Sequence, residues 1–339
     1  MKHRLLLVLM ALPAALCAGW TTEVVASNVL PSAAAASNAK LQAAFRRTLT
    51  VNPYGVLIFV DHTAIAFEDQ VSGVVKLARR KGNAAWTVDV VGNGARPSVK
   101  IDKFGYAHVS YVNSTHGFQY ARAVTQGTGN CGGTNNFACE QIYPPLSTGQ
   151  QDIEIAISND NVVHAYMSNA YMGFDVYMKK PSAGVAFQLI FTSTPTRFSI
   201  AAASDNSLHW VTDSVPQPST YLWHLRFQSW PTEVVGQAVD TGVTPMRLHI
   251  VLDSSNSPHI CLTGTGGASS PLKYLRQNTD LSWSAYTALS AGAADCSIGL
   301  TSGNAIRIGY RDTNTNALMH AWRFINFWQV ETVDTLGDV

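Results

Sequence analysis

Asp253-Ser-Ser-Asn-Ser-Pro-His259-Ile, Leu272-Lys-Tyr-Leu-Arg276 and Trp283-Ser-Ala-Tyr286 follow one another along the chain and decide its fold. The first stretch holds Asp, Asn and Ser between apolar segments, a composition typical of a tight turn between two strands. The second stretch is a short apolar strand, and the third begins another strand on an aromatic residue. Together they predict consecutive short strands joined by turns.

The same unit recurs along the chain. Its closing phrase, Trp230-Pro-Thr-Glu-Val-Val235, returns at Trp328 and at Trp20, and six copies of its turn-plus-strand element align. The aligned copies are Ala36–Gln42, Ile101–His108, Ser158–His164, Ser204–His209, Asp253–His259 and Thr301–Arg307. Gln42 precedes His108 by 66 residues, more than the other spacings of 45 to 56 residues. The alignment therefore predicts an insertion in the first copy, between Thr48 and Gly73.

Two more strands complete each unit. A third strand recurs at Val75–Arg79, Phe118–Arg122, Leu222–Arg226, Leu272–Arg276 and Leu318–Trp322, and a fourth begins at Trp86, Phe187, Trp230, Trp283 and Trp328. Four short strands in a period of about 45 to 50 residues predict an all-β propeller of six four-stranded repeats. We expect one propeller domain over residues 19–339. The Trp20 phrase lies outside the six copies, so a seventh, incomplete blade stays open.

Charge is nearly balanced over the whole chain. Lys and Arg number 23, Asp and Glu number 22, and the formal net charge is +1. The longest basic run is Arg79-Arg80-Lys81. A nucleic-acid-binding protein usually carries a broad basic patch for the phosphate backbone. Nucleic acid is therefore not an expected partner.

The N-terminus has the pattern of an export signal over residues 1–18. Lys2, His3 and Arg4 precede an apolar stretch, and small residues follow up to Ala18. The apolar stretch is shorter than the roughly 20 residues that a transmembrane helix needs, so no transmembrane segment is expected. We predict a secreted or periplasmic protein. A lipid anchor on Cys17 is the less favoured alternative, because Leu16 stands where lipoprotein signals require a small residue.

Four cysteines remain after the signal, and they allow three pairings. Cys131 and Cys139 flank a polar, Gly-rich stretch, which favours a local disulfide, and Cys261 with Cys296 would then join neighbouring repeats. Neither pair has the spacing of a zinc site, so no metal is expected. We also expect no cofactor.

Two copies carry a resemblance to a known repeat family. Asp102, Gly105, His108 and Tyr111 match the pattern D-x-x-G-x-x-H-x-x-Y, and the fifth copy adds Leu272-Lys-Tyr274. This repeat resembles bacterial secreted β-propeller repeats, which are similar in style to sialidase-like Asp-box propellers and to propeller lectins. The resemblance implies the fold, whereas such folds include glycan hydrolases, lectins and proteins of no assigned role.

A sialidase-like enzyme is the first alternative function. It would need an arginine cluster that binds a carboxylate, a tyrosine nucleophile paired with a glutamate, and an acid/base residue. Residues of these types occur, among them Arg46, Arg47, Arg79, Arg307, Asp61 and Glu68, but their positions do not match the family's pattern. The chain has neither an R-I-P triplet near the mature N-terminus nor a complete Asp-box. Catalytic residues are therefore unknown, and an enzyme is not the favoured reading.

Two sets of polar residues, a histidine column and a basic column, recur at equivalent positions of the repeats. Each set has a structural interpretation. The histidines at 108, 164, 209 and 259 recur at equivalent sites and are expected to bond to the backbone of the neighbouring blade rather than hold a metal. The basic residues Arg79, Arg122, Lys179, Arg226 and Arg276 are expected to cap blade edges with charge.

Aromatic residues indicate a function more clearly than the repeated histidines and basic residues do. They are dense in the third and fourth copies, and sugar rings stack on such side chains. The predicted ligand-binding residues are Tyr166, Tyr171, Trp210 and Trp223. We therefore predict a secreted binding module whose partner is a glycan or another extracellular ligand. A cell-surface scaffold for protein interactions is the second alternative.

Overall fold

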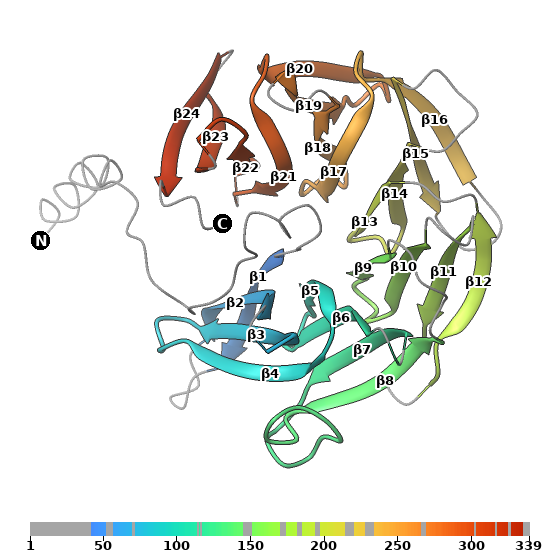
Figure 1. The fold of residues 1–339 in the computed structure, drawn as a ribbon, viewed down its shortest axis with the longest axis vertical. Coiled ribbons are helices and arrows are strands. Elements are labelled where there is room, and N and C mark those ends of the chain that lie inside the picture. Colours follow the sequence, from blue (N-terminus) through green and yellow to red (C-terminus); the bar gives the residue numbers. More distant parts are fainter. Residues whose placement is uncertain are drawn as a thin grey trace, which may run out of the picture.

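The computed structural model is a ring of six antiparallel sheets (Figure 1). The structure describes residues 42–51, 57–69, 72–113, 115, 117–144, 151–169, 174–181, 185–193, 197–213, 220–227, 234–265, 269–301, 303–315, 317–324 and 327–334. The signal region, Cys17 and the Trp20 phrase lie outside these residues. In the described part of the chain, no helix is long and apolar enough to cross a membrane.

Each sheet is one blade, and its four strands follow in sequence order. Blade 1 consists of β1 (Gln42–Val51), β2 (Leu57–Asp69), β3 (Val74–Lys81) and β4 (Thr87–Asn93). Blade 2 consists of β5 (Ala95–Ile101), β6 (Ala107–Asn113), β7 (Gly117–Ala123) and β8 (Phe137–Tyr143). Blade 3 consists of β9 (Gln151–Ile157), β10 (Val163–Asn169), β11 (Phe174–Lys180) and β12 (Gln188–Ser193).

The second half of the ring repeats this arrangement. Blade 4 consists of β13 (Phe198–Ala202), β14 (Leu208–Thr212), β15 (Tyr221–Phe227) and β16 (Val234–Asp240). Blade 5 consists of β17 (Pro245–Leu252), β18 (Pro258–Gly264), β19 (Leu272–Gln277) and β20 (Trp283–Leu289). Blade 6 consists of β21 (Ala293–Leu300), β22 (Ile306–Asp312), β23 (Leu318–Phe324) and β24 (Phe327–Asp334). The prediction of six four-stranded blades is confirmed, and the described residues contain no seventh sheet.

The core lies between the blades. Five clusters of buried apolar side chains fill the five junctions from blades 1 and 2 to blades 5 and 6. The second strands β6 and β18 are therefore buried along nearly their whole length, because neighbouring blades cover both of their faces. The fourth strand β20 is only partly covered, and its half-buried Trp283 packs against the cluster between blades 4 and 5.

A turn with one left-handed residue joins the first two strands of blades 2 to 6. Gly105 has φ +88°, and the matching asparagines have φ between 60° and 66°. Glycine and asparagine tolerate this conformation best, which explains the turn composition of the sequence. The asparagines also link the blades: the Asn256 side chain accepts the backbone N–H of Ser204, and Asn304 accepts that of Ser254.

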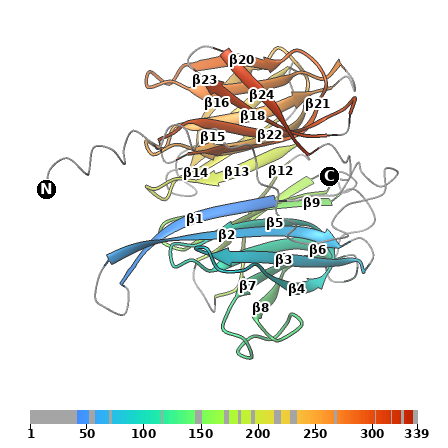
Figure 2. The ribbon, with the colours of Figure 1, turned by 90° about the vertical axis from the view of Figure 1, so that its left-hand side faces the viewer.

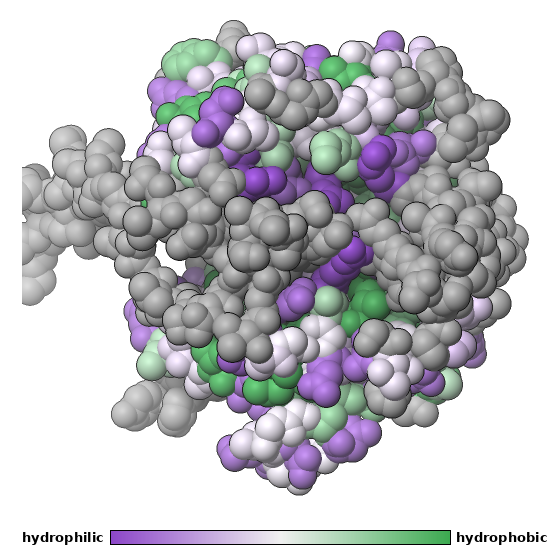
Figure 3. Space-filling view, in the orientation of Figure 1, coloured by the Kyte–Doolittle hydropathy of each residue, from purple (hydrophilic) through white to green (hydrophobic). Residues whose placement is uncertain are grey.

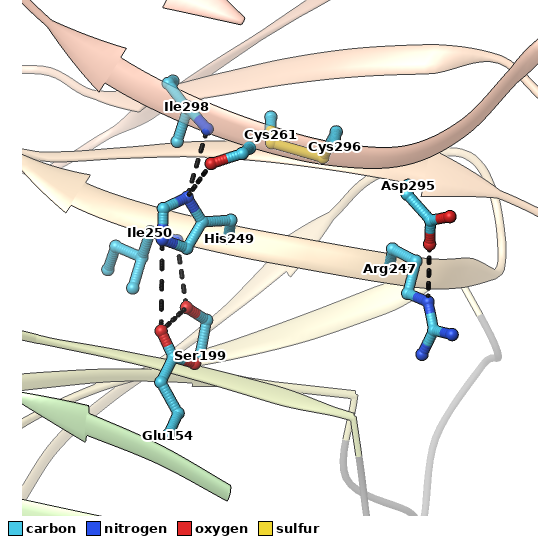
Figure 4. Close-up of a disulfide and its surroundings, with 10 residues drawn as sticks. Glu154, Ser199, Arg247, His249, Ile250, Cys261, Asp295, Cys296 and Ile298 are labelled. Atoms are coloured by element: carbon cyan, nitrogen blue, oxygen red, sulfur yellow. Dashed lines mark hydrogen bonds and ion pairs between the residues drawn. A yellow bond between two sulfur atoms is a disulfide. The ribbon is translucent and has the colours of Figure 1, made fainter. Parts of the chain in front are cut away.

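Polar side chains on the first strands join each blade to the next, and we refer to them as the inner belt. The Gln42 side chain accepts the backbone N–H of Val99, and Ser98 accepts that of Ile155. The belt continues in Figure 4, where Ser199 donates to Glu154. There Ser199 also accepts the N–H of Ile250, and His249 accepts that of Ile298. These bonds connect blades 1 to 6 through the first strands.

Both predicted disulfides are present. Cys131 and Cys139 close a loop of blade 2, and their Cα atoms are 5.9 Å apart. Cys261 on β18 and Cys296 on β21 join blades 5 and 6 across a sequence separation of 35 residues (Figure 4). Disulfides persist in oxidising compartments, so this finding fits an extracytoplasmic location.

The predicted alignment of the first repeat is wrong. Gln42 lies on β1, and the residue that faces Arg79, as His108 faces Arg122, is Ala64 on β2. Ala64 precedes His108 by 44 residues, which is close to the other repeat spacings. The 66-residue spacing came in part from a misplaced register, because Gln42 lies on a first strand and His108 on a second.

The predicted insertion in the first copy is present as a long β1–β2 hairpin (Figure 2): Ala44 pairs with Ala64, 20 residues later, whereas Lys100 pairs with His108, 8 residues later. In this hairpin Leu49 pairs with Phe59, and both are exposed.

Candidate functional site

The repeated histidines are buried packing elements. His108 Nδ1 lies 2.5 Å from the hydroxyl of Tyr120, and its Nε2 lies 3.2 Å from a carboxylate oxygen of Asp102. His259 repeats both contacts with Tyr274 and Asp253, at 2.6 Å and 3.3 Å. These bonds lie within one blade, so the expectation of bonds to a neighbouring blade's backbone is wrong.

The remaining two histidines follow the same plan with different partners. His164 bonds to the Tyr177 hydroxyl, and His209 bonds to His224 on β15 at 3.0 Å. Burial lowers the pKa of His164 to about 4, that of His209 to about 3 and that of His224 to about 4. These imidazoles are therefore neutral at pH 7. Among the described residues, no group of three or more His, Cys, Asp or Glu side chains could hold a metal ion.

The basic column does not cap blade edges as expected. Its residues lie on the third strand, which is interior to each sheet. Several of them form ion pairs with carboxylates of the same blade, such as Arg79 with Asp89 at 2.8 Å and Arg226 with Asp205 at 2.6 Å.

The four predicted ligand-binding aromatics fall in different environments. Tyr166 and Trp210 are only 1% and 6% exposed, and their rings lie 4.6 Å apart in the core between blades 3 and 4. Their burial gives them a packing role. Trp223 on β15 is 36% exposed. Tyr171 lies outside the described residues.

A cleft lies between blades 1 and 2 in the described part of the chain. Its volume is about 420 Å³, and it is open to solvent. Blade 1 contributes parts of β2 and β3 and the loop that leads to β4, and blade 2 contributes the end of β5 and the turn that follows it. In Figure 3, hydrophobic residues gather on the part of the visible face where blades 1 and 2 lie.

His62 and Gly105 bring the two walls of the cleft together. A Cβ atom on Gly105 would lie 2.4 Å from the His62 ring, so only glycine permits this approach. The His62 ring is also held by the hydroxyl of Thr48, 3.0 Å from Nε2. Burial and the charge of Lys81 lower the pKa of His62, so the ring is neutral at pH 7.

The wall from blade 1 carries three consecutive cations. Arg79 is ion-paired with Asp89, whereas the Arg80 guanidinium lies over the Trp86 ring, 4.7 Å from its centroid. Lys81 is exposed and has no ion pair within the described residues. All three residues line the cleft, although alternation along β3 points the Arg80 side chain to the face opposite that of Arg79 and Lys81.

The wall from blade 2 carries two exposed aromatic rings. Phe104 is 61% exposed and Tyr106 is 43% exposed, both in the turn between β5 and β6. The Arg122 guanidinium lies 4.7 Å from the Tyr106 ring centroid and supports that ring. The cleft therefore has cationic residues in the wall from blade 1 and aromatic residues in the wall from blade 2.

The contact between His62 and Gly105 gives the first prediction. Gly105→Ala should lower the free energy of unfolding by about 1 to 3 kcal/mol, because alanine adopts a left-handed conformation only with strain and its Cβ meets the His62 ring. Urea unfolding measures the change.

Gly127→Ala is the matched control for this variant. Gly127 has φ +80°, close to that of Gly105, but no atom lies within 4 Å of a Cβ built there. The Gly105 variant should thus be the less stable of the two. Equal losses in both variants would mean that the contact with His62 does not constrain the cleft.

Comparisons with known proteins support the fold. No protein-family model matches the chain, and no curated protein matches it in sequence. Among solved structures, it is similar to the fucose-specific lectin of Aleuria aurantia, with TM-score 0.56, 12% identity, and coverage of 87% of this chain and 96% of the lectin. The NanB sialidase of Streptococcus pneumoniae gives TM-score 0.50 and 9% identity, covering 88% of this chain and 69% of the sialidase.

A third similar structure is an ulvan lyase bound to a GlcA(1-4)Rha3S saccharide, with TM-score 0.53, 12% identity, and coverage of 82% of this chain and 78% of the lyase. This chain is a six-bladed β-propeller similar to propeller lectins and sialidases. At such low identity the likeness extends to the fold alone.

The arginines weighed for a sialidase site do not line one cleft. Arg79 lines the cleft between blades 1 and 2, but Arg46 and Arg307 do not. Arg307 lies on β22 in blade 6, where its guanidinium is 5.8 Å from the Trp322 ring centroid. The side chain of Arg47 lies outside the described part.

The sequence patterns did not predict the cleft, although two segments that line it were noted for other reasons. The run Arg79-Arg80-Lys81 was weighed only against a nucleic-acid surface, and Gly105 only as a repeat marker. Phe104 and Tyr106 flank that glycine at the tip of a turn. Large aromatics in a solvent-facing turn were the available signal, because loops on a rigid scaffold often carry binding residues.

Proposed function

We propose that this protein binds carbohydrate in the cleft between blades 1 and 2. The observation that carries the proposal is the pair of exposed rings, Phe104 and Tyr106, on the wall of a cleft that is open to solvent. Its volume of about 420 Å³ falls within the range of about 300 to 1,000 Å³ that is typical of small-ligand sites. A sugar ring can place its apolar C–H face on an aromatic ring while its hydroxyls bond to nearby polar groups.

Similarity to a fucose-specific lectin along 96% of that lectin's chain supports the proposal, because a protein of similar fold is a sugar-binding lectin. The two disulfides support an extracytoplasmic location, where glycans are the common ligands. We therefore also propose that the protein is secreted or periplasmic.

Tyr106→Ala tests the proposed site. It should weaken binding of any glycan found on a glycan array by about tenfold or more, because stacking on an exposed aromatic ring is worth about 1 to 3 kcal/mol. The fold should be retained, since Tyr106 lies in a turn and is 43% exposed. Calorimetric titration with the glycan measures the change.

Trp223→Ala is the matched control, because it removes the exposed aromatic predicted from the sequence and lies in blade 4. Binding lost in the Trp223 variant and kept in the Tyr106 variant would place the ligand at Trp223 instead. An array with no bound glycan at high protein concentration would contradict the carbohydrate-binding function itself.

A further inference from the structure

The long β1–β2 hairpin of blade 1 leaves the body of the ring. In Figure 2 the end of this hairpin extends beyond the strands of the other blades on one side of the ring. β3 ends at Lys81, which pairs with His62, so in the described ladders residues 57–60 pair only with β1. The hairpin therefore continues past the four-stranded sheet as a ribbon of two strands.

The end of this ribbon exposes large apolar side chains on both of its faces. Leu49 pairs with Phe59, and Leu57 lies on the same face because side chains alternate along a strand. Ile58, between Leu57 and Phe59, points to the opposite face. The exposed fractions are 56% for Leu49, 63% for Leu57, 39% for Ile58 and 71% for Phe59. We refer to these four residues as the apolar tip.

The tip is short and is bounded by charge. Residues 48–51 and 57–60 include no charged residue, whereas Arg47 and Asp61 form the next pair toward the sheet. From Leu49 to the last pair of the hairpin the strand advances two residues, which is about 7 Å. Segments that lie at a membrane surface bury their apolar side chains to a depth of about 5 to 10 Å. The uncharged length of the hairpin thus matches the depth of the lipid interface.

Area and shape decide what covers the tip. Its four side chains expose on the order of 400 Å² of apolar surface, which is the size of patch that marks an interaction site. A stable protein–protein contact needs about 800 Å² from each partner, so the tip alone does not hold a second copy of the chain. A protein partner would also cover one face of the ribbon, whereas a lipid bilayer surrounds an inserted tip on every side.

We propose that the apolar tip inserts into the interfacial region of a lipid bilayer and holds the propeller at a membrane surface. Insertion stays shallow, because the outer edges of a two-stranded ribbon carry unpaired backbone groups that are costly to bury in hydrocarbon. Arg46 lies just behind the tip at the level of the headgroups, so anionic lipids strengthen binding. None of the four tip residues lines the cleft between blades 1 and 2, so the membrane contact is separate from the proposed carbohydrate site.

The test measures co-sedimentation of the full-length protein with vesicles of phosphatidylcholine, alone or with about 30% phosphatidylglycerol. We expect binding to both, and Leu49→Ser/Phe59→Ser should lower the partition coefficient by about tenfold or more, because burial of each large apolar side chain contributes. Raising NaCl from about 0.1 to 0.5 M should leave binding to phosphatidylcholine unchanged, because salt screens charges and not apolar burial.

Two further measurements keep the result interpretable. Met246→Ser/Leu281→Ser removes exposed apolar side chains from blade 5 and should leave partitioning unchanged. The N-terminal apolar stretch can itself bind lipid, so the result rests on differences between variants of the same chain. An environment-sensitive dye on Phe59→Cys should brighten when vesicles are added, and the same dye on Leu281→Cys should not. The dye reports insertion even if the double variant fails to fold.

Three outcomes would overturn the proposal. The first is equal partitioning of the unaltered protein and the Leu49/Phe59 variant. The second is binding that about 0.5 M NaCl abolishes, which would show adsorption through charge without insertion. The third is a lipid-free dimer in sedimentation velocity that the Leu49/Phe59 variant loses, which would assign the tip to a second copy of the chain.

Discussion

Removing the disulfide between blades 5 and 6 is expected to lower the free energy of unfolding by about 4 kcal/mol. Cys261→Ala/Cys296→Ala releases a closed loop that spans 35 residues of sequence, so the unfolded chain gains conformational freedom. Alanine is the suitable replacement, because Cys261 is fully buried and a serine hydroxyl there would add a second cost. Guanidinium unfolding under oxidising conditions measures the change.

The second disulfide supplies the control. Cys131→Ala/Cys139→Ala opens a loop with a sequence separation of only 8, for which the same chain-entropy relation gives about 2.5 kcal/mol. The bond between blades 5 and 6 should therefore contribute more. An equal or larger loss in the Cys131/Cys139 variant would show that loop closure does not account for the stabilisation.

Acidification from pH 6.5 to 4.5 is expected to lower the free energy of unfolding by on the order of 6 kcal/mol, about 2 kcal/mol for each of three buried histidines. Burial, and after it the charge of Lys179, lowers the pKa of His164 to about 4, and the pKa values of His209 and His224 are about 3 and 4. In the unfolded chain these imidazoles titrate near pH 6.5. The unfolded state therefore binds more protons in this interval, and stability falls as the pH falls.

Denaturant unfolding at several pH values measures this loss. Two carboxyls with shifted pKa values differ in their effect. Hydrogen bonds from His108 and from backbone amides hold the pKa of Asp102 below its usual range despite burial, so its contribution is lost only at lower pH. Burial raises the pKa of Glu68, so protonation of this group offsets a part of the loss. His164→Gln should reduce the slope by about one proton. A stability that stays flat between pH 6.5 and 4.5 would show that these histidines are not held neutral.

The sequence predicts the blades well because strand, turn and spacing recur in each copy. The register failed only in blade 1, where Ala64 occupies the position that carries His108, His164 or His259 elsewhere. Without that polar marker, alignment of the first copy relied on composition and chose Gln42. Local pattern identifies a repeat, but pairing between strands fixes its register.

The exposure of the aromatic side chains was harder to predict, because both faces of a middle strand are buried. In an open sheet, Tyr166 or Trp210 next to polar residues could face solvent, but here each face of β10 and β14 meets another blade. Polar neighbours such as His164 are buried as well. The exposure of a side chain in a ring of blades depends on contacts between repeats. The sequence pattern of a single repeat does not show these contacts.

The hydrogen bonds of the inner belt determine how freely the sequences of the blades can diverge. At four of its junctions the acceptor is a side chain of one blade and the donor is a backbone N–H of the next, as in Ser98 with Ile155, and every residue except proline supplies that donor. A blade is thus joined to its successor without any requirement on the successor's side chain. Gln42, Ser199 and His249 fill the same role in different blades. Blades can therefore diverge in sequence, or be exchanged with one another, while the joints of the ring persist.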